Sequence, residues 1–425
     1  MVSGAFAACG SESNRLAMRD GQAGAGGLSE GGRVQGGAAG HGFGEPSELG
    51  GGGRGDVQEP PAGGGGADAG AGAPGSEPEQ AGAGGSGGAQ PGPGLTSAYL
   101  YAGTTTAKIV GYAVDAQTGA LSTLPTSPYD GVLGLGSEHP SGRFFYATNY
   151  NGNTVSGFAV GSEGALSLIN TLPAGSSPEV AKVHPSGDFL YAGNIFGGGT
   201  SIYTIDRETG KLAASTPLDA GLYNHGLAFD PTGQYFYLAR NNSNDVTRFV
   251  VDAETGASSD PKTLAAVGGY HAAMDPLGQY LFVSSWDKGG NKVSSYELSA
   301  VDGTVTRVGD YDSRGTTPAG LAVTPDGRWL YVVNYGNQAL AGFAIDRATG
   351  ALSPVAQTPL NGPDYELCLD HSGRFLYAGT TQGLNGYTID AQTGVLTTIA
   401  GSPFQNGLAA ADLSVGHCVL VRKTN

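Results

Sequence analysis

Two histidines occupy corresponding places in consecutive copies of a repeated segment. His225 lies in YNHGLAFDPTG and His271 lies in GGYHAAMDPLG. A neutral imidazole can accept a proton from water near pH 7, so two histidines at one site suit general base catalysis. We therefore treat His225 and His271 as candidate catalytic residues, with a structural role for each as the alternative.

Other polar and aromatic side chains lie beside these histidines or at comparable places in other copies. The candidates for binding a substrate are Glu179, Tyr223, Arg240, Tyr270, Tyr365 and Glu366. Hydrolysis at a carbonyl carbon needs a base for water and a donor for the developing oxyanion, and these residue types supply both. The alternative for the charged members is simple solvation at the ends of strands.

The spacing within the two segments raises a geometrical difficulty. His225 precedes Asp230 by five positions, whereas His271 precedes Asp275 by four. In regular strands this difference in parity would point the two side chains to opposite faces. Both can face one site only if one of them lies in an irregular part of its strand.

The segments belong to a repeat that runs through most of the chain. Its first signature recurs every 45 to 49 residues, as PSGRFFYATN at Pro140, PSGDFLYAGN at Pro185, PTGQYFYLAR at Pro231, PLGQYLFVSS at Pro276, PDGRWLYVVN at Pro325 and HSGRFLYAGT at His371. SAYLYAGTTT near Tyr99 is a seventh copy without the turn. A second signature follows each copy, as in YTIDRETGKL and FAIDRATGAL, and predicts an apolar strand, a tight turn and a short strand.

Seven units of four short strands predict an all-β fold, a seven-bladed β-propeller of four-stranded antiparallel blades. Strands such as FLYAG are apolar on both faces, as expected for blades packed between neighbours. We expect the ring to close through a last inner strand near 408–414. Residues 418–421, CVLV, could compete for the same place, and the pattern does not decide between them.

Composition divides the chain into two regions. Residues 1–95 hold 32 of the 76 glycines and two aromatic residues, so we expect a disordered Gly-rich tail. Residues 96–425 form the predicted propeller and carry −10 of the net charge of −16, which argues against nucleic acid as a partner. No apolar run is long enough for a membrane-spanning helix.

The N-terminal residues MVSGAFAACG resemble a bacterial lipobox with a truncated signal peptide, in which Cys9 would be lipidated. This predicts an exported lipoprotein of the cell envelope, periplasmic or anchored to the outer membrane, that meets a membrane only through this lipid anchor. The alternative is a cytoplasmic protein with an ordinary tail. Cys368 and Cys418 then remain either as a disulfide pair or as buried thiols.

The remaining histidines occupy turns, and several common functional motifs do not occur in the sequence. His139, His184 and His371 fall at the turn of the repeat, where Asp or Pro stands in other copies, so we expect a turn role. No metal-binding pattern and no phosphate-binding loop before a helix occurs, so we expect neither a metal nor a cofactor. We also expect a monomer.

The two signatures resemble those of the lactonase family of seven-bladed propellers, which includes 6-phosphogluconolactonases and carboxy-cis,cis-muconate cyclases. The resemblance covers about residues 97–414. It implies that functional residues lie where the inner strands meet the central funnel, in an HPH-type and a GPRH-type motif on consecutive blades. His225 matches the second His of the first motif, and His271 matches the His of the second.

The chain departs from this family pattern at three places. Tyr270 replaces the Arg of the GPRH-type motif, Arg240 replaces an Asp, and Trp286 with Asp287 beside it replaces an acidic residue. Loss of the Arg removes a cationic fork for an anionic substrate. These departures argue against a phosphorylated lactone as the substrate.

Two functions remain. The first is a lactonase-like hydrolase that opens a sugar or related lactone through His225 and His271. The second is a non-catalytic propeller on the cell surface that binds a glycan or protein, because YATNYNGNTVSGF also resembles the YVTN repeats of surface-layer propellers.

Overall fold

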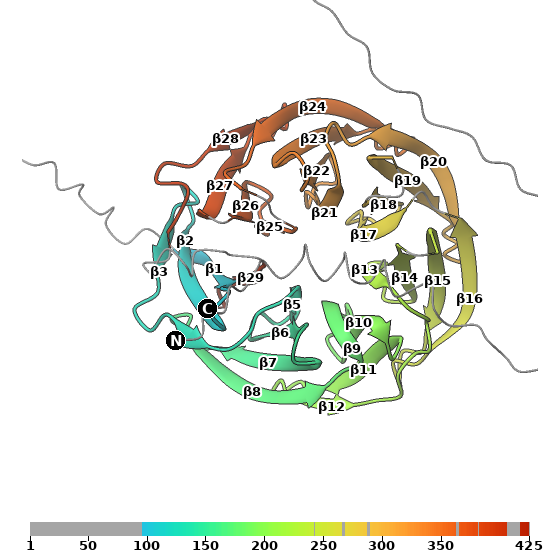
Figure 1. Ribbon diagram of the computed structural model, residues 1–425, viewed down its shortest axis with the longest axis horizontal. Helices are drawn as coiled ribbons and strands as arrows, with labels where there is room; N and C mark the ends of the chain where they lie inside the picture. Colours follow the sequence, from blue (N-terminus) through green and yellow to red (C-terminus); the bar gives the residue numbers. More distant parts are fainter. Residues whose placement is uncertain are drawn as a thin grey trace, which may run out of the picture. The chain divides into compact units, whose positions relative to one another are not determined.

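The computed structural model describes residues 96–241, 243–265, 268–286, 290–362, 365–380, 382–405 and 417–424. These residues form seven antiparallel sheets arranged around a central axis, with no helix among them, so the predicted β-propeller is confirmed (Figure 1). Four of the sequence-based expectations fall outside the described residues. They concern the tail 1–95, Cys9, Asp287 and the strand expected at 408–414.

Each blade is numbered from its inner strand outward, except for the blade that contains both ends of the folded region. Six blades consist of consecutive strands: β5 (Gly136–Glu138), β6 (Phe144–Asn149), β7 (Thr154–Val160) and β8 (Leu166–Pro173); β9 (Ser176–Val183), β10 (Phe189–Gly197), β11 (Thr200–Ile205) and β12 (Leu212–Ala214); β13 (Asn224–Phe229), β14 (Tyr235–Arg240), β15 (Asp245–Val251) and β16 (Ser258–Ala265); β17 (Gly269–Met274), β18 (Tyr280–Ser285), β19 (Lys292–Leu298) and β20 (Val305–Asp312); β21 (Pro318–Val323), β22 (Trp329–Asn334), β23 (Ala339–Ile345) and β24 (Leu352–Pro359); β25 (Leu367–Leu369), β26 (Phe375–Thr380), β27 (Gly383–Ile389) and β28 (Leu396–Thr398).

The remaining blade closes the ring. It contains β29 (Cys418–Arg422), β1 (Thr96–Gly103), β2 (Lys108–Asp115) and β3 (Leu121–Thr123) in that order, and the short β4 (Tyr129–Asp130) also pairs with β2. The innermost place is taken by β29, which pairs antiparallel with β1 from Ala98–Arg422 to Ala102–Cys418. The segment CVLV, which competed with 408–414 for this place, therefore closes the ring.

The tyrosine of the first signature and the glycine of the second meet between neighbouring blades. The Tyr146 hydroxyl donates to the Gly210 carbonyl at 2.9 Å, and the Tyr377 hydroxyl donates to the Gly119 carbonyl at 2.7 Å across the point of closure. Four further pairs repeat this contact: Tyr101–Gly164, Tyr191–Gly256, Tyr237–Gly303 and Tyr331–Gly394. Burial of these hydroxyls makes each hydrogen bond costly to lose, so the two signatures specify how blades dock.

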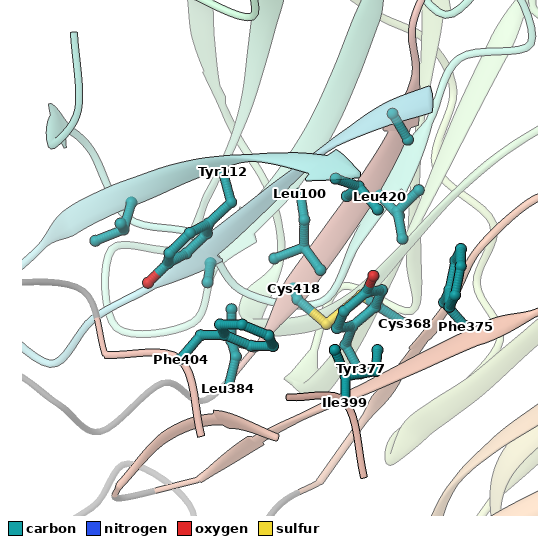
Figure 2. Close-up of a cluster of buried hydrophobic side chains, with 14 residues drawn as sticks. Leu100, Tyr112, Cys368, Phe375, Tyr377, Leu384, Ile399, Phe404, Cys418 and Leu420 are labelled. Atoms are coloured by element: carbon teal, nitrogen blue, oxygen red, sulfur yellow. A yellow bond between two sulfur atoms is a disulfide. The ribbon is translucent and has the colours of Figure 1, made fainter. Parts of the chain in front are cut away.

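A disulfide crosses the closing junction. Cys368 of β25 bonds to Cys418 of β29, which resolves the two alternatives for this pair in favour of a disulfide. Figure 2 shows the bond among Leu100, Phe375, Tyr377 and the other side chains of one buried apolar cluster. The disulfide therefore joins the last complete blade to the strand that completes the ring.

Candidate functional site

Four residues from three neighbouring inner strands form a contiguous polar cluster. Glu179 of β9 contacts Nδ1 of His225 on β13, and its Oε1 accepts a hydrogen bond from the Tyr270 hydroxyl of β17 at 3.1 Å. The Tyr270 ring lies 4.6 Å from the His225 ring and 4.9 Å from the His271 ring, between centroids. We call Glu179, His225, Tyr270 and His271 the histidine cluster.

Every member of the histidine cluster lies at a β-bulge. On β9, Pro178 and Val180 pair with consecutive residues of β10, which leaves Glu179 without a partner position. The register shifts in the same way around His225 on β13 and around Tyr270 and His271 on β17. A bulge changes the direction of the side chains beside it, so the parity difficulty disappears, and both strands are irregular where only one needed to be.

Gly226 allows the two histidine-bearing strands to approach each other. A Cβ atom on Gly226 would lie 2.6 Å from the Tyr270 carbonyl oxygen and 2.8 Å from the Ala272 nitrogen. Real Cβ atoms do not come so close to backbone, so a larger residue would push β17 away from β13. The glycine after His225 thus brings the histidine cluster together.

Hydroxyl groups at the ends of second strands hold this backbone in place. The Thr148 hydroxyl donates to the Glu179 carbonyl at 2.9 Å. Ser284 accepts a hydrogen bond from the His271 backbone nitrogen at 3.1 Å and donates to the Ala319 carbonyl at 2.7 Å, which links β18 to the next blade. The bulges are therefore supported from neighbouring strands, which suits a site that must keep its geometry.

Burial and charge set the protonation of the cluster. Burial alone would raise the pKa of Glu179, but His225, His271 and the Tyr270 hydroxyl outweigh it and hold the pKa below its ordinary value. Burial lowers the pKa of His271 to about 3, so this imidazole is neutral at physiological pH. Its Nε2 atom is buried and has no hydrogen-bond partner among the described residues. The cluster thus combines a carboxylate paired with His225 and a neutral histidine opposite.

Three further ionisable groups lie close to the cluster. Burial lowers the pKa of His417, which directly precedes β29, to about 4. Burial raises the pKa of Glu366, which directly precedes β25, to about 7. Lys182 of β9 lowers the pKa of both His271 and Glu366 through its charge, which places all three groups within electrostatic range.

An aromatic wall, made of Trp286, Tyr335 and Tyr365, adjoins the histidine cluster through Tyr270. The Tyr270 and Trp286 rings stack at 4.6 Å, Trp286 and Tyr365 at 5.6 Å, and Tyr335 and Tyr365 at 4.4 Å. These rings come from three neighbouring blades and bury Ala319 beneath them. They offer ring faces next to the polar cluster, a combination that suits a substrate with C–H groups on one face.

The remaining candidates are placed around this cluster in different ways. Tyr223 lies before β13, with its ring 6.3 Å from the His225 ring. Tyr365 belongs to the aromatic wall. Arg240 binds Asp245 through two hydrogen bonds of 2.8 and 2.9 Å and the Ala220 carbonyl at 3.0 Å, so its guanidinium holds the hairpin of its own blade.

The sequence did not single out His417, Lys182 or Tyr335. His417 was missed because the closing strand was expected to end before it. Lys182 lies inside a β-strand with no motif around it, and only the bulge at Glu179 brings both residues of β9 into the same region. A signal was present for Tyr335, which follows the first signature in the copy at Pro325.

The turn histidines divide into two kinds. His139 and His184 are buried, and each binds a serine of its own turn and a glycine carbonyl of the next blade, as a turn role requires. The His371 side chain instead contacts Glu138 of β5 at 2.5 Å. Within the described residues, no group of three His, Cys, Asp or Glu side chains is arranged to hold a metal ion, and no helix could cross a membrane.

The buried histidines predict a dependence of stability on pH. Unfolded His271 and His417 would bind protons below about pH 6.5, whereas the folded protein resists this down to about pH 3 and 4, so stability falls as the pH falls through this window. As the pH falls from 6.5 to 4.5, the free energy of unfolding of His271→Gln should rise by about 2–3 kcal/mol relative to that of wild type. Denaturant unfolding measures this difference.

Glu366 predicts a dependence of stability on pH in the opposite direction, which serves as a control. Its folded pKa of about 7 exceeds the ordinary value of 4.5, so the folded state binds the extra proton, and stability falls as the pH rises through this window. Glu366→Gln should therefore gain stability relative to wild type from pH 4.5 to 7. If the free energy of unfolding of either variant depended on pH as that of wild type does, the shifted pKa of the replaced residue would be contradicted.

Comparison with known proteins agrees with the fold. A family model described as "Lactonase, 7-bladed beta-propeller" matches residues 137–221, 225–364 and 312–410. A putative 6-phosphogluconolactonase from Bacteroides uniformis is similar in structure, with a TM-score of 0.66 and 21% identity, over 77% of this chain and 100% of that one. A periplasmic gluconolactonase from Pseudomonas aeruginosa also has a TM-score of 0.66, with 17% identity. The similarity covers 77% of this chain and 99% of that one.

Curated relatives match over a shorter stretch. A 6-phosphogluconolactonase from Sodalis glossinidius is 29% identical over 37% of this chain and 50% of its own length. A 6-phosphogluconolactonase from Pectobacterium carotovorum is 25% identical over 32% of this chain and 43% of its own length. The match thus spans about half the length of these relatives. The family model covers more than half of this chain, and the chain belongs to the family of lactonases with a seven-bladed β-propeller.

Proposed function

We propose that this protein hydrolyses an uncharged sugar lactone, or a related lactone, at the histidine cluster. The observation that carries the proposal is the contact of His225 with Glu179 beside the buried, neutral His271. Family membership and relatives named 6-phosphogluconolactonase support a lactone as the substrate. A cluster of this chemistry also favours a hydrolase over a propeller that only binds a glycan or protein.

In this mechanism His225 acts as the general base. Contact of its Nδ1 with Glu179 leaves Nε2 to accept a proton from water, and the carboxylate stabilises the imidazolium that forms. The water oxygen bonds to the lactone carbonyl carbon, the ring C–O bond breaks, and His225 returns the proton to the leaving oxygen. The products are a hydroxyl and a carboxylic acid on one open chain.

The surroundings favour an uncharged substrate over a phosphorylated one. Tyr270 stands where the resembling motif has an arginine, and the Arg240 guanidinium is occupied by Asp245. The aromatic wall offers ring faces instead of cations beside the cluster. A phosphate would therefore lose its water without gaining a bidentate partner.

The test compares a neutral aldonolactone with 6-phosphogluconolactone on the full chain, with buffer blanks for spontaneous opening. We expect kcat/KM for the neutral lactone to exceed that for 6-phosphogluconolactone by about tenfold or more. This is the effect typical of one missing charge-assisted contact to the phosphate. His225→Ala and His271→Ala should each remove most of the enzymatic rate. Inactivity on both lactones, or full activity in both variants, would refute the proposal.

We also propose a location in the cell envelope. The disulfide between Cys368 and Cys418 is of a kind that persists in oxidising compartments. Lipidation of Cys9 would add an anchor there, and labelling with a radioactive fatty acid in a Cys9→Ser variant tests it.

A further inference from the structure

A cavity of about 190 Å³ lies among the inner strands at the closing junction. Residues of β5, β9, β25 and β29 line it, so it follows the central axis of the ring at the closing junction. Glu366 and Lys182, both in electrostatic contact with the histidine cluster, contribute to the lining, and so do Glu138 and His371. Two residues of the lining, Lys182 and Glu366, thus interact electrostatically with the histidine cluster.

The acidic groups around this cavity are compensated. Glu138 accepts hydrogen bonds from the backbone nitrogen and Nε of Arg422, at 2.8 and 3.1 Å, and contacts His371. Glu179 is paired with His225. Glu366 holds its proton up to about neutral pH, because burial raises its pKa to about 7.

Lys182 forms an ion pair with none of these three carboxyl groups. It lies on β9 with its backbone opposite Tyr191, and its ammonium group makes no ion pair with any residue that the structure describes. It lines the cavity, and its charge acts on His271 and on Glu366. A partly buried cation without a counter-ion beside a cavity is a place for an anion.

We propose that Lys182 binds the carboxylate of the ring-opened hydroxy acid, and the oxyanion that precedes it, in this cavity. The inference rests on the proposed lactone hydrolysis, which turns an uncharged ester into a carboxylate. Lys182 then carries out the task of the arginine that Tyr270 replaces, from a different strand. Preorganised positive charge at the developing oxyanion lowers the barrier, and the same charge retains the product.

Binding of gluconate, the open-chain anion of a neutral aldonolactone, tests this without turnover. Calorimetry on the full chain at low salt should show gluconate binding that Lys182→Met weakens by about tenfold or more, while Lys182→Arg restores part of it. Lys211→Met removes a charge from an exposed turn and should bind as wild type does. Thermal unfolding of all variants verifies that they are folded.

Kinetics separate this inference from the proposed function. Lys182→Met should lower kcat on the neutral lactone and abolish product inhibition by gluconate, whereas His225→Ala should lose turnover and keep gluconate binding. Gluconate binding that depends on Lys182 in a protein without lactonase activity would support the anion site and refute the hydrolase. No gluconate binding by wild type, or equal binding by Lys182→Met, would overturn the inference.

Discussion

Glu179→Gln is expected to lower kcat on a neutral lactone by about 10⁴-fold, with a much smaller change in KM. The amide keeps the size of the side chain but cannot stabilise the imidazolium that His225 becomes when it takes a proton from water. Loss of the corresponding carboxylate in a catalytic triad has an effect of this order. Steady-state kinetics against spontaneous lactone opening measure it.

Two matched variants show whether the charge itself matters. Tyr270→Phe removes only the hydrogen bond of 3.1 Å to Glu179, and we expect a loss of about tenfold, because a hydrogen bond to a charged group contributes about 1.5–3 kcal/mol. Glu208→Gln changes an exposed turn and should leave the rate unchanged. A Glu179→Gln enzyme within twofold of wild type would exclude Glu179 from the mechanism.

The second large effect concerns closure of the ring. Replacing both Cys368 and Cys418 by serine should lower the free energy of unfolding by about 4 kcal/mol, as loop entropy predicts for a separation of 50 residues. Denaturant unfolding with and without a reductant measures the difference. The reductant should destabilise wild type and leave the double variant unchanged, and equal stability of oxidised and reduced wild type would contradict the prediction.

Loss of the disulfide should also change the geometry of the candidate site. Glu366 lies two residues before Cys368, and His417 directly precedes Cys418. Without the disulfide, β29 is held by its pairing with β1 and by the apolar cluster around Leu100 and Leu420 (Figure 2). We therefore expect lactone turnover to fall in reductant at temperatures well below global unfolding.

The candidate site was predictable in part. His225 and His271 could be found because the repeat aligns them, and Glu179 because it occupies the same place in another copy. What alignment could not provide is their contact through Tyr270, since a bulge changes the direction of a side chain without any mark in the sequence. Arg240 shows the opposite case, in which a conspicuous charge is bound by its own hairpin.

The fold was determined by the sequence almost completely. Strands and turns are encoded locally, by short apolar runs, by turn residues and by the tyrosine and glycine that dock each blade on the next. Seven copies of one such pattern are compatible with few architectures. Closure by β29, the disulfide, and the meeting of Lys182, Glu366 and His417 were decided only by the tertiary structure. These contacts join residues up to several blades apart, and no local pattern records which distant strands will become neighbours.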